Sequence, residues 1–135
     1  MSFINDTLII LINIIHIVIL VFVIGAPFSN SNYLILLHII VVPFIMLHWL
    51  LNNNMCCLTL AEKYVREKTT REIVNHEDCF THKLISPIYD FNKNNDDFSA
   101  FIYLITTFLW TISVYNFGKK YVNGQIRTID DLAQI

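Results

Sequence analysis

Three long segments without a charged side chain constrain this chain more than any other feature of its sequence. They run from about residue 7 to 26, 33 to 51 and 98 to 117. A hydrocarbon core about 30 Å thick is crossed by about 20 helical residues at a rise of 1.5 Å each, and none of the three carries an Asp, Glu, Lys or Arg. With a mean hydropathy of +0.53, the 135 residues are too apolar for a soluble domain of this size. We therefore expect one all-α domain, an integral membrane helical bundle with three transmembrane helices.

The connections between these segments set the expected topology. Residues 27–32 are short and rich in turn formers, so the first two spans should form an antiparallel hairpin. The 52–97 connection holds six basic residues, against three in the polar tail 118–135. By the positive-inside rule, the 52–97 connection lies on the cytoplasmic side and the C-terminus on the opposite side. The absence of a basic tract argues against nucleic acid as a partner.

Two local patterns predict details of the helices. Pro43 lies inside the second span and removes one helical hydrogen bond, which bilayer helices tolerate when a neighbouring group repairs the loss. Thr59 and Glu62 have the spacing of a capping box, so a helix should begin at Thr59. From Leu60 to about Val74 a short apolar stripe alternates with charged pairs, which predicts an interfacial amphipathic helix.

Four polar side chains fall within the first two spans: Asn13, His16, His38 and His48. Polar groups at membrane depth need partners. Hydrogen bonding between helices is the common role; bis-histidine haem ligation and a proton path through Asn13 and His16 remain alternatives. The histidines lie at unequal depths along their helices, which disfavours haem.

A second group of candidate residues follows the second span. His76, Cys79 and His82 are three residues apart and share one helical face, and together with Cys56 and Cys57 they supply ligand types suited to zinc. The spacing is not a specific zinc pattern, and the cysteines can equally be small buried apolar residues. A thiol redox role is disfavoured because adjacent cysteines form only a strained disulfide. We therefore predict no cofactor, with zinc or haem as the alternatives.

Several positions resemble a bacterial family of small multi-span membrane proteins of unknown function that carries a Cys-Pro-Leu-Thr-x-Leu-Glu motif. The matching residues are His16, Phe22, Val23, Gly25, Trp49, Cys56, Leu58, Thr59, Glu62, Phe80, Thr81, His82 and Tyr89. Cys57, Ala61 and Asp90 depart from the pattern. The Asn52–Asn54 run resembles related membrane proteins of giant DNA viruses. The resemblance implies a multi-span membrane fold and no mechanism.

The sequence favours a structural or interaction role, without predicted catalytic residues. The expected partners are the lipid bilayer and other membrane proteins or further copies of the chain. One alternative is a metal- or haem-binding membrane redox protein with a site near Cys56 and His82. A further alternative is an oligomeric proton-conducting pore.

Overall fold

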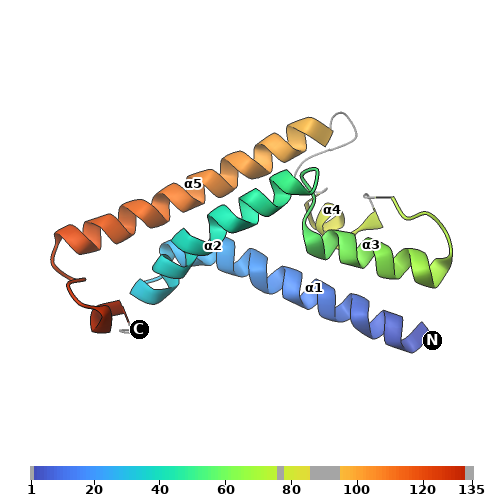
Figure 1. Cartoon of the computed structure of the whole chain (residues 1–135), viewed down its shortest axis with the longest axis horizontal. Coiled ribbons are helices and arrows are strands. Elements are labelled where there is room, and N and C mark those ends of the chain that lie inside the picture. The colour runs from blue at the N-terminus through green and yellow to red at the C-terminus, as the bar shows by residue number, and fades with distance from the viewer. Residues whose placement is uncertain (1, 76–77, 86–94, 133–135) are drawn as a thin grey trace. The chain divides into compact units, whose positions relative to one another are not determined.

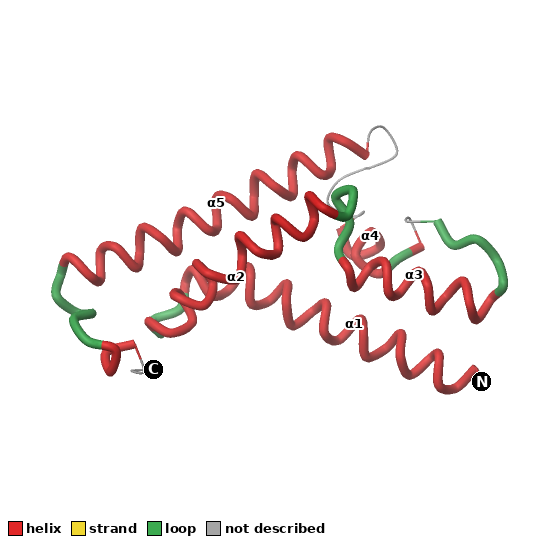
Figure 2. The backbone as a smooth tube through the Cα atoms, viewed as in Figure 1, coloured by secondary structure: helices red, strands yellow, loops and turns green. Residues whose placement is uncertain are grey.

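The computed structural model describes residues 2–75, 78–85 and 95–132, and within these ranges every regular element is helical (Figures 1 and 2). The predicted all-α class is confirmed for this part of the chain. The α-helices are α1 (Ser2–Gly25), α2 (Asn32–Leu51), α3 (Cys57–Thr70), α4 (Phe80–Ile85) and α5 (Asn95–Val122). Two short 3-10 helices, η1 (Ala26–Phe28) and η4 (Ile129–Leu132), complete the order.

Three helical stretches are long and apolar enough to cross a membrane, as predicted. They comprise Phe3–Phe28, Asn32–Leu51 and Ser99–Val122, so the first and third exceed the expected limits by several residues. In their most apolar windows only 11%, 17% and 17% of the residues are buried. Most apolar side chains therefore face outward, the arrangement expected of helices whose solvent is hydrocarbon.

The chain divides into two compact units. The first comprises residues 1–19 and 48–98, and the second comprises residues 20–47 and 99–135. The first unit contains the N-terminal part of α1, the end of α2, and α3 and α4. The second contains the remainder of α1, most of α2, and the apolar length of α5.

A proline at the end of the first span creates the central polar contact of the second unit. Pro27 has no N–H to donate to the carbonyl oxygen of Val23, four residues earlier. The Nε2 atom of buried His38 donates to that oxygen instead, at 3.0 Å. The Ser113 hydroxyl of α5 lies 2.9 Å from the other ring nitrogen and must donate to it. One imidazole therefore joins three helices and supplies the hydrogen bond that the Val23 carbonyl oxygen would otherwise lack.

A side chain also replaces the hydrogen bond that the second proline cannot donate. Pro43 cannot donate to the carbonyl oxygen of Ile39, and the indole N–H of Trp110 on α5 does so at 3.0 Å. This contact is the neighbouring-group repair that the sequence analysis anticipated for Pro43. Asn116, further along α5, donates to the carbonyl oxygen of Pro27 at 2.9 Å. Two polar residues of α5 thus bind backbone oxygens of the first two spans, and one of these oxygens, that of Ile39, lacks its helical donor because of Pro43.

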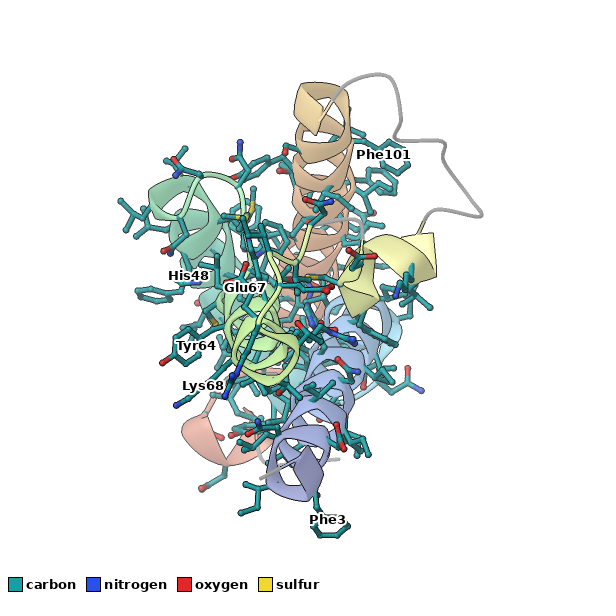
Figure 3. All side chains as sticks on the ribbon, turned by 90° about the vertical axis from the view of Figure 1, so that its right-hand side faces the viewer. Phe3, His48, Tyr64, Glu67, Lys68 and Phe101 are labelled. Carbon is teal, nitrogen blue, oxygen red and sulfur yellow. The ribbon has the colours of Figure 1, made fainter. Side chains whose placement is uncertain are left out.

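In the first unit, α3 runs back alongside the N-terminal half of α1 (Figure 1). Figure 3 shows the Tyr64 side chain of α3 pointing away from α1. The Lys68 ammonium lies 5.9 Å from the centre of the Tyr64 ring, and both residues are exposed. The opposite face of α3 carries Glu62, which is fully buried. Helix α3 therefore buries a charged side chain and exposes an aromatic one, and its predicted position at a membrane interface stays a prediction.

Candidate thiol site

A left-handed turn links α2 to α3 and explains the run of asparagines. Asn53 and Asn54 have φ values of 51° and 63°, a region that Asn enters more readily than other non-glycine residues. The N–H of Asn54 bonds to the carbonyl oxygen of Trp49 at 2.8 Å, which closes the C-terminal turn of α2. The chain reverses here within a few residues and delivers Cys56 to the start of α3.

Cys56 is the N-cap residue of α3 and lies against a histidine of α1. Its backbone is extended, with φ −73° and ψ 140°, and its side chain is half-buried. The imidazole of His16, only 3% exposed, forms a hydrogen bond with the Cys56 sulfur. This contact joins two residues that are 40 positions apart, and no sequence spacing indicates it.

The surroundings of Cys56 favour its thiolate. Burial alone would raise the pKa of the thiol, but the hydrogen bond from His16 and the backbone amides of Leu58 and Thr59 outweigh it. The net result is a pKa below the ordinary value for cysteine. Amides at a helix N-terminus and an adjacent imidazole are the two environments that commonly activate protein thiols.

The other two cysteines are perturbed in the opposite direction. Partial burial and the neighbouring Cys56 sulfur raise the pKa of Cys57. Cys79 is fully buried, and burial followed by the negative charge of Glu62 raises its pKa. The structure therefore separates one activated thiol from two that stay protonated at neutral pH.

His48 supports the same helix start. Its Nε2 atom accepts the backbone N–H of Cys57 at 3.1 Å, so that nitrogen carries no proton. Cys57 is the first residue of α3, and its N–H has no partner within the helix. The Asn52 side chain donates to the carbonyl oxygen of His48 at 2.8 Å, which holds the turn beneath the ring. His48 acts here as a capping residue, a role that the sequence analysis missed.

The predicted capping box at Thr59 and Glu62 is wrong. Helix α3 begins at Cys57, two residues before Thr59. The buried Glu62 carboxylate instead accepts the N–H of Phe80, at 3.1 and 3.2 Å, where α4 begins. It also pairs with Arg66 at 2.8 Å. Glu62 therefore caps a different helix, whose start is distant in sequence and invisible to a local motif.

The α1 face that meets Cys56 carries a second polar group. Asn13 lies three residues before His16, so the two share a face of the helix. The Oδ1 atom of Asn13 is buried and has no hydrogen-bond partner among the described residues. The ring of Phe80 lies 6.3 Å from that of His16, centre to centre, and closes the site on its α4 side.

The remaining predicted site residues fall elsewhere or outside the described ranges. His38 belongs to the second unit and has both ring nitrogens engaged, so it offers no free nitrogen to haem iron. His76 lies outside the described residues, as does the side chain of His82. Where side chains are described, no group of three or more His, Cys, Asp or Glu residues is placed to hold a metal ion.

No family model, curated protein or solved structure matches this chain.

Proposed function

We propose that this membrane protein uses Cys56 as a nucleophile, activated by His16, to accept an acyl group from a thioester. The observation that supports the proposal most directly is the hydrogen bond between the His16 imidazole and the Cys56 sulfur. Thiolates are the nucleophilic form of cysteine, and an adjacent imidazole is a common means of forming them. Three helices long and apolar enough to cross a membrane support a substrate that carries a lipid chain.

The proposed step is an exchange without net oxidation. The Cys56 sulfur attacks the carbonyl carbon of the acyl thioester and forms a new carbon–sulfur bond. The bond to the leaving sulfur breaks, and the proton that His16 took from Cys56 passes to the leaving thiolate. The amides of Leu58 and Thr59, which face the sulfur, are candidate donors to the oxyanion of the tetrahedral intermediate.

The exposed side of α1 is apolar near the turn that carries His16. Ile14, Ile17 and Val18 are each more than two-fifths exposed, on the side of the helix that faces away from His16, so an alkyl chain can lie against α1. The Asn13 Oδ1, which has no partner in the described part of the chain, adds a polar acceptor on the face that carries His16. A buried acceptor without a donor costs about 1–3 kcal/mol, which a donor from water or substrate would offset.

The other functions draw less support from the contacts. Association through polar helix faces is weakened because His38, Trp110 and Asn116 bind atoms of their own chain. Disulfide exchange between Cys56 and Cys57 would pass through a strained ring. A pore through Asn13 and His16 must compete with the His16 bond to Cys56.

The same proposal includes the position of the site. We infer from the excess of basic residues in 52–97 that Cys56 lies on the cytoplasmic side. Thiols stay reduced there, which keeps the nucleophile available.

The test is acyl transfer to the purified protein in nanodiscs. With a long-chain acyl-coenzyme A, we expect one hydroxylamine-sensitive acyl group per chain on Cys56, detected by intact-mass analysis. Cys56→Ser should abolish the label, and His16→Phe should slow its formation about 100-fold or more, the usual contribution of general acid–base catalysis. Cys57→Ser is the matched control and should label at the wild-type rate. Absence of the thioester in a folded wild-type protein, or labelling that survives Cys56→Ser, would refute the proposal.

A further inference from the structure

We propose that the second unit binds the phosphate group of an anionic phospholipid in a basic groove where the three spans end together. The first span ends at Phe28, the second begins at Asn32 and the third ends at Val122, so one membrane surface meets all three. A groove of about 320 Å³ lies at this point, lined by the η1 turn and the last turns of α5. This site is independent of Cys56, because its residues belong to the other unit.

Lys120 is held in place at the groove by its own chain. Its ammonium donates to the carbonyl oxygen of Asn30 at 2.6 Å and to Oδ1 of Asn32 at 2.9 Å. A lysine ammonium has three donors, so a third remains for a ligand. Because two bonds already fix the side chain, little conformational entropy is lost when an anion binds.

The charged side chains that line the groove are basic. Among the described residues its lining includes Lys119 and Lys120 and no Asp or Glu. The guanidinium of Arg127 lies against Gly124. The two sequence neighbours of Gly124, Asn123 and Gln125, line the groove. A phosphate is the ligand that suits such a set of fixed and mobile cations.

The Asp131 carboxylate, on the segment that follows α5, accepts backbone donors. Asp131 accepts the N–H groups of Arg127 and Thr128, at 2.8 and 2.9 Å, together with the Thr128 hydroxyl. These bonds hold the pKa of Asp131 below its usual value. Asp131 is therefore ionised, caps η4 and attracts the Arg127 guanidinium, while Lys119 and Lys120 are the basic residues that line the groove.

The rim of the groove indicates a lipid rather than a soluble phosphate. Phe28 lines the groove and is 66% exposed, and Tyr121 and Val122 beside the lysines are also exposed. Tyr33 is exposed one residue after the start of α2. Aromatic side chains gather at membrane interfaces, where the ring lies beside the upper acyl chain and the polar groups remain hydrated.

The experiment measures lipid retention by native mass spectrometry of the full chain, with phosphatidylglycerol, phosphatidylcholine or inorganic phosphate as the probe. We expect one tightly held phosphatidylglycerol per chain, with weaker binding of phosphatidylcholine and none of inorganic phosphate. Lys119→Gln should weaken phosphatidylglycerol binding about fivefold, the usual contribution of one basic residue near an anionic surface. Lys120→Gln should weaken it at least as much.

Lys68→Gln is the matched control, since Lys68 is an exposed lysine in the other unit, and it should bind phosphatidylglycerol as the wild type does. Weaker binding in Lys119→Gln cannot be attributed to lost internal hydrogen bonds, because those of Lys120 stay intact in that variant. Equal binding of phosphatidylcholine, saturation by inorganic phosphate alone, or an equal loss in Lys68→Gln would each overturn the proposal.

Discussion

The repair of Pro43 by Trp110 can be tested with a double-mutant cycle. The indole N–H of Trp110 donates to the Ile39 carbonyl oxygen at 3.0 Å because Pro43 cannot. Trp110→Phe removes the donor and part of the ring, so it costs a packing contribution plus the unsatisfied carbonyl. In membrane proteins such interhelical bonds average about 0.6 kcal/mol and reach about 1.7 kcal/mol. We take about 1 kcal/mol for this one, because the carbonyl has no alternative donor within its helix.

Pro43→Ala supplies the missing N–H, which can bond to Ile39 in the ordinary helical manner. In that background Trp110→Phe should cost only the packing contribution. The free-energy cost of Trp110→Phe should therefore be about 1 kcal/mol smaller in the Pro43→Ala variant than in the wild-type chain. The assay is reversible unfolding in mixed micelles, followed by far-ultraviolet circular dichroism because Trp110 itself is altered.

Trp49→Phe is the matched control, since Trp49 is the only other tryptophan and belongs to the first unit. Its free-energy cost should be the same in the wild-type chain and in the Pro43→Ala variant. If the Trp110→Phe and Pro43→Ala effects add within about 0.3 kcal/mol, the size of ordinary additivity error, the indole does not repair the proline and the reasoning fails.

Three further predictions concern the first unit. The pKa of Cys56 is lowered in the folded state, so its thiolate should stabilise the fold fully above the ordinary thiol pKa of about 8.5. The free energy of unfolding should therefore exceed that of Cys56→Ser at high pH, and this difference should disappear as the pH falls through the lowered pKa. A difference that is constant between pH 5 and about 9 would contradict the prediction. Glu62→Gln should lower the free energy of unfolding by about 2 kcal/mol and speed hydrogen exchange at the Phe80 amide. Glu67→Gln is the control: it breaks a more exposed ion pair with Lys63 and should lower the free energy of unfolding by less than about 1 kcal/mol. Arg71→Gly should raise the free energy of unfolding by about 1 kcal/mol, because Arg71 ends α3 with φ 57°, a left-handed conformation that is strained for a residue with a side chain. An unchanged or lower free energy would show that the arginine side chain contributes more stability than this backbone strain costs.

Local sequence patterns succeeded where their physical cause is local. The three spans follow from uncharged length alone, because hydrocarbon penalises every charge along a helix. The need for a repair at Pro43 follows from its missing N–H. The Asn run marked the end of the second span, and its left-handed φ values are a property of Asn itself.

The candidate site could be predicted only in part. The sequence singles out Cys56 but favours His82 as its partner, and the side chain of His82 lies outside the described residues. The partner that the structure shows is His16, on a helix that precedes Cys56 by 40 positions. Glu62 was misassigned for the same reason, since its true partner is 18 residues away at Phe80.

The sequence by itself therefore determined the three long apolar helices, their capacity to cross a membrane, and the hydrogen bond that Pro43 removes from the second of them. Only the tertiary structure decided which side chains satisfy those carbonyls and which imidazole meets the Cys56 sulfur. Helix formation and membrane solvation depend on composition along a short stretch of chain. Partner choice depends on which faces of distant helices come together: Trp110 reaches across 71 positions to Ile39, and Ser113 across 75 to His38.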